Sequence, residues 1–155
     1  MLRMTLCEIV KGKRLLLKKA SRGISRGKWN GLGGKIEGGE SEKESAMREV
    51  EEESGLRAKR LERRGTIYFS KGSRGNKMGR ISLFICESFS GALMGGGKGE
   101  LKWFDAENLP YDRMWDDDRY WMPLFMRGYA FEAEFIYDKR MERVIGLSIR
   151  KIRKA

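Results

Sequence analysis

The chain has 155 residues, no histidine and two cysteines, and its 33 lysines and arginines against 22 acidic residues give a formal charge of +11. This length is typical of one globular domain, so we expect a single domain over residues 1–155. No apolar run is long enough to span a membrane and no signal-peptide pattern is present, which predicts a soluble, cytoplasmic protein without a membrane partner. Cys7 and Cys86 lie far apart in apolar segments, and we expect reduced, buried thiols.

Hydrophobic periodicity predicts the elements in chain order. Two strands come first, Met4–Val10 and Arg14–Lys18, joined by a turn around Gly12. A basic, glycine-bearing loop over residues 21–34 leads to a helix that begins near residue 41. Further strands are expected at residues 61–70, 80–88 and 101–104, then a helix at residues 118–126, and a closing β-hairpin at residues 129–137 and 143–152. Two helices that cover a strand-rich core predict an α/β sandwich with a mixed β-sheet.

The first predicted helix carries start and stop signals. Ser41 followed three residues later by Glu44 is the capping-box pattern, and Gly55 is placed to end the helix in a left-handed conformation. At about 100° per residue, one arc of the helix is apolar and is expected to pack on the core. That arc consists of Ala46, Met47 and Val50.

Three carboxylates, Glu49, Glu52 and Glu53, share the neighbouring arc of this helix. They repel one another, and the helix dipole disfavours them further near the C-terminal end, so the cluster is costly unless a cation neutralises it. Hard oxygen ligands in a chain without histidine indicate Mg²⁺, or Mn²⁺, and not zinc. The alternative is a solvated acidic face, with the adjacent Arg48 in a surface ion pair worth about 0–1 kcal/mol.

The residues from Gly34 to Leu56 fit the pattern G-x5-E-x7-R-E-h-x-E-E-x-G-h at every fixed position, where h is hydrophobic. The fixed positions are Gly34, Glu40, Arg48, Glu49, Val50, Glu52, Glu53, Gly55 and Leu56. This segment resembles the loop–helix–loop signature of the Nudix hydrolases. The resemblance implies an α/β/α Nudix fold and a metal-dependent enzyme that splits nucleoside diphosphates linked to a further group. It also implies that Arg48 holds the catalytic carboxylates in place.

Two other runs, Trp29–Lys35 and Met114–Leu124, resemble the MutT-type oxidised-purine nucleoside triphosphatases of animals, in collinear register from residue 15 to about residue 149. The resemblance implies that Glu49, Glu53 and the Gly33 carbonyl bind the metal, and that Glu52 is a further ligand or a proton acceptor. Glu100 is its candidate for a carboxylate supplied from a distant loop. The implied substrate-binding residues are Asn30, Lys35, Trp115, Asp117 and Asp118.

Such a base pocket is chemically reasonable. Stacking of a purine on Trp115 is worth roughly 1–3 kcal/mol. Asp117 and Asp118 cannot both ionise cheaply in a partly dry pocket, so the pair can share a proton and both donate to and accept from a purine edge. The alternative is that Trp115 and Trp121 are core aromatics and the aspartates cap the following helix.

The sequence departs from these relatives at two positions. Ile24 stands where they carry an aromatic pocket residue, and Lys71 falls at or near another such position. A weaker aromatic cage puts the preferred base in question more than the reaction.

Three functions remain open at this point. The first is a Mg²⁺-dependent hydrolysis of oxidised purine nucleoside triphosphates, such as 8-oxo-dGTP or 2-hydroxy-dATP, to monophosphate and pyrophosphate, which would sanitise the nucleotide pool. The second is a Nudix hydrolase of capped RNA, dinucleotides or ADP-ribose. The third is a nucleic-acid-binding module without turnover, since a basic surface can contact RNA or DNA weakly as well as steer polyanionic substrates. We expect a monomer in each case.

Overall fold

A computed structural model describes residues 1–94 and 99–155. The glycine run at residues 95–97 lies outside them. The described elements, in chain order, are β1 (Leu2–Lys11), β2 (Arg14–Ala20), β3 (Trp29–Asn30), β4 (Leu32–Lys35), α1 (Glu42–Ser54), β5 (Arg57–Lys71), β6 (Lys77–Ser90), β7 (Gly99–Asp105), a 3₁₀ turn (Tyr111–Arg113), α2 (Asp118–Met126), β8 (Tyr129–Tyr137) and β9 (Val144–Lys154).

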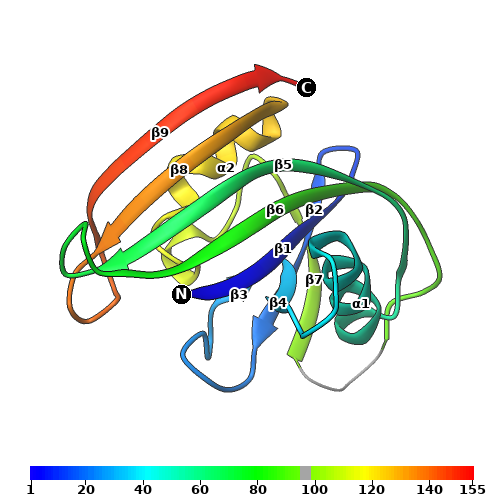
Figure 1. Ribbon diagram of the computed structural model, residues 1–155. Helices are drawn as coiled ribbons and strands as arrows, with labels where there is room; N and C mark the ends of the chain where they lie inside the picture. Colours follow the sequence, from blue (N-terminus) through cyan, green and yellow to red (C-terminus); the bar gives the residue numbers. More distant parts are fainter. Residues whose placement is uncertain (95–98) are drawn as a thin grey trace.

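The strands form one mixed sheet in the order β3-β2-β1-β6-β5-β8-β9, with β4 also paired to β1 and β7 to β2 (Figure 1). The β1–β6 and β5–β8 pairs are parallel, and the other pairs are antiparallel. Because β4 joins the sheet beside β1 and leads directly into α1, the start of the helix motif is tied to the centre of the sheet.

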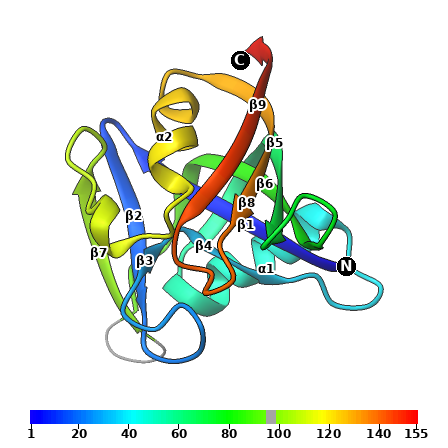
Figure 2. The same ribbon diagram turned by 90° about the vertical axis from the view of Figure 1, so that its left-hand side faces the viewer.

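The two helices cover opposite faces of the sheet (Figures 1 and 2). Successive residues of β1 alternate between these faces, so Cys7 and Ile9 pack with α1 whereas Val10 packs with α2. The α1 core is smaller and mostly aliphatic, with the aromatic Phe84 among its buried residues, and the α2 core holds the large aromatic side chains of Trp121, Phe125, Phe131 and Phe135. The predicted α/β sandwich with a mixed sheet is therefore confirmed.

The end signals predicted for α1 are confirmed, but one residue of its apolar arc is wrong. Ser41 and Glu44 form the reciprocal capping box, and Gly55 is left-handed at φ 82°. Ala46 and Val50 are buried, but Met47 is 41% exposed. Ser45 and Ser54 are buried instead: Ser54 Oγ donates to the Val50 carbonyl at 2.6 Å, and Ser45 Oγ lies 3.3 Å from the Thr5 hydroxyl of β1.

The remaining elements follow the expected order with two differences. The strands β5 and β6 are longer than predicted, since residues 57–71 and 77–90 pair into a long hairpin with several register shifts. The predicted loop at residues 21–34 is partly wrong, because it contains β3 and most of β4; Gly33 and Gly34 join the sheet through pairing to β1 and not through propensity. The helix at residues 118–126 and the closing hairpin are confirmed.

Both cysteines are free and buried, as expected. Within residues 1–94 and 99–155, none of the helices is both long and apolar enough to cross a membrane.

Candidate active site

A cavity of about 550 Å³ opens between the sheet, the β3–β4 segment and the start of α2. Its lining is apolar along β1, β5 and β6, and polar at two ends. One end carries Lys18, Lys35 and Glu53, and the other carries Asp117 and Asp118. The cavity therefore joins the helix motif of α1 to the distal run at the start of α2.

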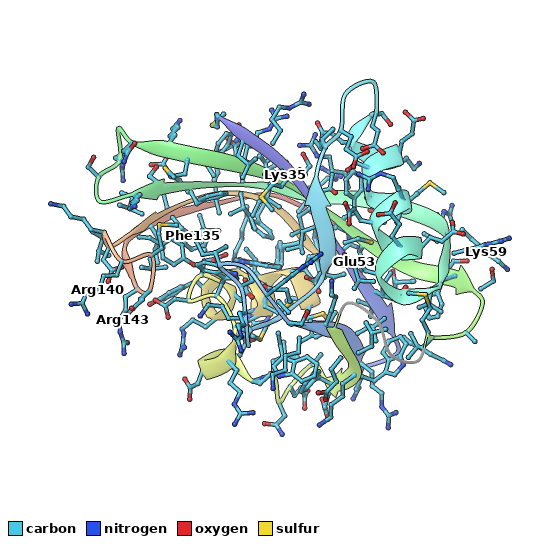
Figure 3. The ribbon with its side chains drawn as sticks, turned by 90° about the horizontal axis from the view of Figure 1, so that it is seen from below. Lys35, Glu53, Lys59, Phe135, Arg140 and Arg143 are labelled. Atoms are coloured by element: carbon cyan, nitrogen blue, oxygen red, sulfur yellow. The ribbon has the colours of Figure 1, made fainter. Side chains whose placement is uncertain are left out.

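Glu53 lies at the last turn of α1, against β4 (Figure 3). Its Oε1 accepts a hydrogen bond from the Gly33 amide at 2.7 Å, and its Oε2 lies 2.6 Å from Lys18 Nζ. Glu49, one turn earlier, packs against Gly34, where an added Cβ would lie 2.6 Å from Glu49 Oε1. Glycine at 34 thus lets the backbone of β4 approach two carboxylates at once.

Arg48 holds the acidic residues of the motif together. Its guanidinium donates to both oxygens of Glu40, at 2.6 and 3.0 Å, to Glu49 at 2.9 Å and to Glu52 at 3.1 Å. These hydrogen bonds lower the pKa of Glu40 to about 2. The arrangement of Arg48 is that of a multidentate clamp, which a lysine could not reproduce.

The residues at this end fit a divalent cation. The donors are hard carboxylate oxygens on a helix that faces a glycine strand, with neither histidine nor cysteine beside them. Burial and repulsion from Glu53 raise the pKa of Glu49, the situation that a bound cation relieves. Over residues 1–94 and 99–155, no three acidic side chains lie in a ready metal-binding cluster. Lys18 and Arg48 instead neutralise these carboxylates through ion pairs.

The other predicted metal-site residues are placed less directly. Glu52 is half exposed on the outer side of Arg48. Gly33 contacts Glu53 through its amide, which donates to Glu53 Oε1. Glu100 lies in β7 opposite Lys19, whereas Lys18 is opposite Leu101. Since neighbouring side chains of a strand point to opposite faces, Glu100 points away from the face that carries Lys18 and Glu53, and it does not line the cavity.

At the other end of the cavity, the partly buried Asp117 and the buried Asp118 form a carboxyl pair. Asp117 accepts hydrogen bonds from the Tyr137 hydroxyl and, at 2.8 Å, from Trp121 Nε1. Burial raises the pKa of Asp117, and it raises that of Asp118 further because Asp117 is beside it. Asp118 therefore holds a proton more tightly than Asp117 does. Asp117 occupies the N-cap position of α2, but its side chain makes no cap hydrogen bond and accepts from Tyr137 and Trp121 instead, which argues against a capping role for this carboxylate.

The aromatic residues of the distal run divide between core and cavity. Trp121 is fully buried, as the core alternative predicted. Trp115 is half buried and lines the cavity; its Nε1 donates to Ser25 Oγ at 3.0 Å and its ring meets Tyr137 edge to face. Asn30 and Lys35 also line the cavity, from β3 and β4.

The cavity residues that sequence reasoning missed include Lys18, Phe69 and Tyr137. Phe69 supplies an aromatic wall two residues before Lys71, and both line the cavity. Ile24 lines it too, but is 75% exposed. The aromatic cage is therefore less depleted than Ile24 and Lys71 suggested. The alternation of side chains along β5 could have indicated that Phe69 faces the cavity. The sequence around Tyr137, in contrast, is that of an ordinary core strand.

A model of the NUDIX domain matches residues 3–125, which include the whole of α1, β4 and the cavity-facing start of α2. The chain belongs to the Nudix family. Nudix hydrolases generally use divalent metal ions, in agreement with the carboxylate end of the cavity.

Relatives in two vertebrates are similar over nearly the whole chain. An oxidized purine nucleoside triphosphate hydrolase from Danio rerio is 35% identical over 135 residues, which cover 87% of this chain and 86% of the relative. A hydrolase of the same name from Mus musculus is 30% identical over 148 residues, covering 96% and 94%. Among solved structures, the MutT protein from Bacillus halodurans superposes with a TM-score of 0.84 at 24% identity, over 96% of this chain and 97% of that one, which shows the shared Nudix fold.

Proposed function

We propose that this chain hydrolyses oxidised purine nucleoside triphosphates to a monophosphate and pyrophosphate, and thereby removes them from the nucleotide pool. The observation that supports this most is the cavity, whose lining includes the motif carboxylate Glu53 at one end and the aspartates Asp117 and Asp118 at the other. Its volume of about 550 Å³ is within the range of small-ligand sites. The hydrolases from Danio rerio and Mus musculus, which match 87% and 96% of this chain, support the same substrate class.

In the proposed reaction, a water oxygen bonds to a phosphorus of the triphosphate while the bridge to the departing pyrophosphate breaks. Glu49 and Glu53 would hold Mg²⁺, or Mn²⁺ in its place, and the Gly33 carbonyl would be a further ligand. The cation supplies charge neutralisation and a more acidic water. Either Glu52 or Glu53 accepts the water's proton. Lys18 and Lys35 line the same end of the cavity and are placed to contact phosphate oxygens.

At the other end of the cavity, polar side chains recognise the edge of the base by hydrogen bonds. Asp118 donates a hydrogen bond, Asn30 offers both a donor and an acceptor, and Trp115 and Phe69 provide aromatic surface. Asp117 is held by Tyr137 and Trp121, which fixes the pair in position. We further propose that residues 1–155 act as one domain and as a monomer in the cytoplasm.

A pair of variants is expected to separate base reading from stacking. Asp117→Asn should reduce the preference for an oxidised base, because an amide cannot exchange a proton with Asp118, and a mismatched polar contact costs several kcal/mol. Trp115→Ala should weaken all bases together, by roughly 1–3 kcal/mol. The measurement is kcat/KM for 8-oxo-dGTP, 2-hydroxy-dATP and dGTP in each variant. Unchanged ratios in Asp117→Asn would contradict the base-reading role.

The basic surface favours a second candidate, hydrolysis of capped RNA. The turn between β8 and β9 carries Arg140 and Arg143, far from Glu53 and α1 (Figure 3). Hydrolysis of capped RNA at physiological salt that exceeds hydrolysis of 8-oxo-dGTP would favour this candidate. Tight, steeply salt-dependent RNA binding without any Mg²⁺-dependent hydrolysis would instead favour a binding module.

A further inference from the structure

Glu8 is a buried carboxyl that the proposed chemistry does not use. It lies in the middle of β1, at the centre of the sheet, and only 1% of its surface is exposed. Its Oε2 has no hydrogen-bond partner among the residues that the structure describes. A carboxyl in this position is costly to bury, and an aliphatic side chain would fit the surrounding core without that cost.

The Glu8 carboxyl packs against the wall of the cavity. A Cβ added at Gly31 would lie 2.7 Å from Glu8 Cδ, so the carboxyl touches the glycine backbone itself. Gly31 lines the cavity between Asn30 and Leu32, next to the end that carries the aspartate pair. Glycine at 31 is therefore what lets a buried carboxyl come this close to the site.

Glu8 is electrostatically coupled to the aspartate pair. Asp118 owes its raised pKa first to burial, then to Asp117, then to Glu8. Burial alone raises the pKa of Glu8 to about 8.

The other ionisable groups around this cluster come from several elements. Cys7 of the same strand feels the charge of Glu8, while Tyr137 of β8 and Tyr111 of the 3₁₀ turn feel that of Asp118. Lys18 of β2 shares the cavity but is paired with Glu53. The strand partner of Glu8 in β6 is Ile85, which carries no charge.

We propose that Glu8 is a positioning residue for base recognition, whose carboxyl, packed behind Gly31, decides whether Asp118 can give up its proton. The inference rests on the proposed function. While Glu8 is neutral, Asp117 and Asp118 share a proton and can present either a donor or an acceptor. Once Glu8 ionises, a second negative charge keeps the proton on Asp118, so the pair presents a donor only. The base preference of the site therefore changes with pH as Glu8 titrates.

The test measures nucleotide binding without turnover. The dissociation constants of 8-oxo-dGMP, 2-hydroxy-dAMP and dGMP are measured between pH 6.5 and 9 without divalent cation, in the parent protein, in Glu8→Gln and in Glu8→Leu. Ionisation of each ligand is common to all proteins, so the informative quantity is the difference between their profiles. A coupling of about one pKa unit corresponds to a tenfold change in the ratio of protonated to ionised Asp118. The ratio of the dissociation constants of 8-oxo-dGMP and 2-hydroxy-dAMP should therefore change with pH by up to about tenfold more in the parent than in the Glu8 variants.

Glu132→Gln is the matched control, because Glu132 lies on β8 and is paired with Arg150. Its profile should follow the parent. Parallel profiles in the parent and both Glu8 variants, with the preference for oxidised bases intact, would overturn this inference alone. A parent protein that binds neither oxidised monophosphate better than dGMP would overturn the proposed function, and this inference with it.

Discussion

Glu53→Gln is expected to lower kcat by about two to four orders of magnitude while the fold survives. The amide keeps the size of the side chain, and its oxygen can still accept the Gly33 N–H at the position of Glu53 Oε1. What is lost is one negative charge at the proposed metal site, and with it the carboxylate proposed as a proton acceptor. Relief of the repulsion with Glu49 offsets the weakened contact with Lys18, so stability should change little.

Glu51→Gln is the control for this prediction. Glu51 lies on the same helix, but it is exposed and paired loosely with Arg57 at 3.7 Å. It should retain the parent kcat. Steady-state kinetics with 8-oxo-dGTP and thermal unfolding of both variants give the comparison. Near-parent activity in Glu53→Gln would mean that α1 does not carry the catalytic centre.

Glu8→Leu is expected to stabilise the protein strongly at alkaline pH. The pKa of Glu8 is raised from 4.5 to about 8, so the folded state holds a proton that the unfolded state has released. The contribution of the protonated Glu8 to the free energy of unfolding is therefore fully present below about pH 4.5. It is lost as the pH rises through about 8, by about 3–5 kcal/mol in total. Leucine removes this dependence and leaves no unpartnered oxygen in the core.

The measurement is the free energy of unfolding in urea at pH 5 and at pH 9. The gain of Glu8→Leu over the parent should be larger at pH 9 by about 3–5 kcal/mol, because groups shared by both proteins cancel in the difference. Glu132→Leu is the control, because the Glu132 side chain on β8 is 43% exposed. Its effect on the free energy of unfolding should not increase between pH 5 and pH 9. Equal gains at both pH values would show that Glu8 titrates normally in the folded protein.

The local signals of α1 and α2 were readable because they act within a few residues. Ser41, Glu44 and Gly55 specify the ends of α1 by hydrogen bonds within its own turns. By contrast, β4 consists largely of glycine-rich sequence and becomes a strand only because β1 offers it partners. Met47 was wrongly predicted to be buried for a related reason. Helical periodicity gives the direction of a side chain, whereas its burial depends on how far the neighbouring strands extend.

The two ends of the cavity differ in the same way. Spacing on one helix grouped Glu49 with Glu53, and the distal run indicated Asp117 and Asp118. Neither could indicate Lys18, which lines the cavity, or Glu8, which packs behind Gly31, because strand pairing positions both residues. Glu100 was proposed from its distance to Trp103 along the chain, and strand alternation decides its direction instead.

Selectivity between an oxidised and an ordinary purine tests the central claim most directly. Pyrophosphate release is measured with Mg²⁺ from 8-oxo-dGTP, 2-hydroxy-dATP, dGTP and dATP under one set of conditions. The account predicts that kcat/KM for at least one oxidised nucleotide exceeds that of its unoxidised counterpart by about tenfold or more, as expected for a site that pairs with polar base edges. Equal, slow turnover of all four nucleotides would contradict it.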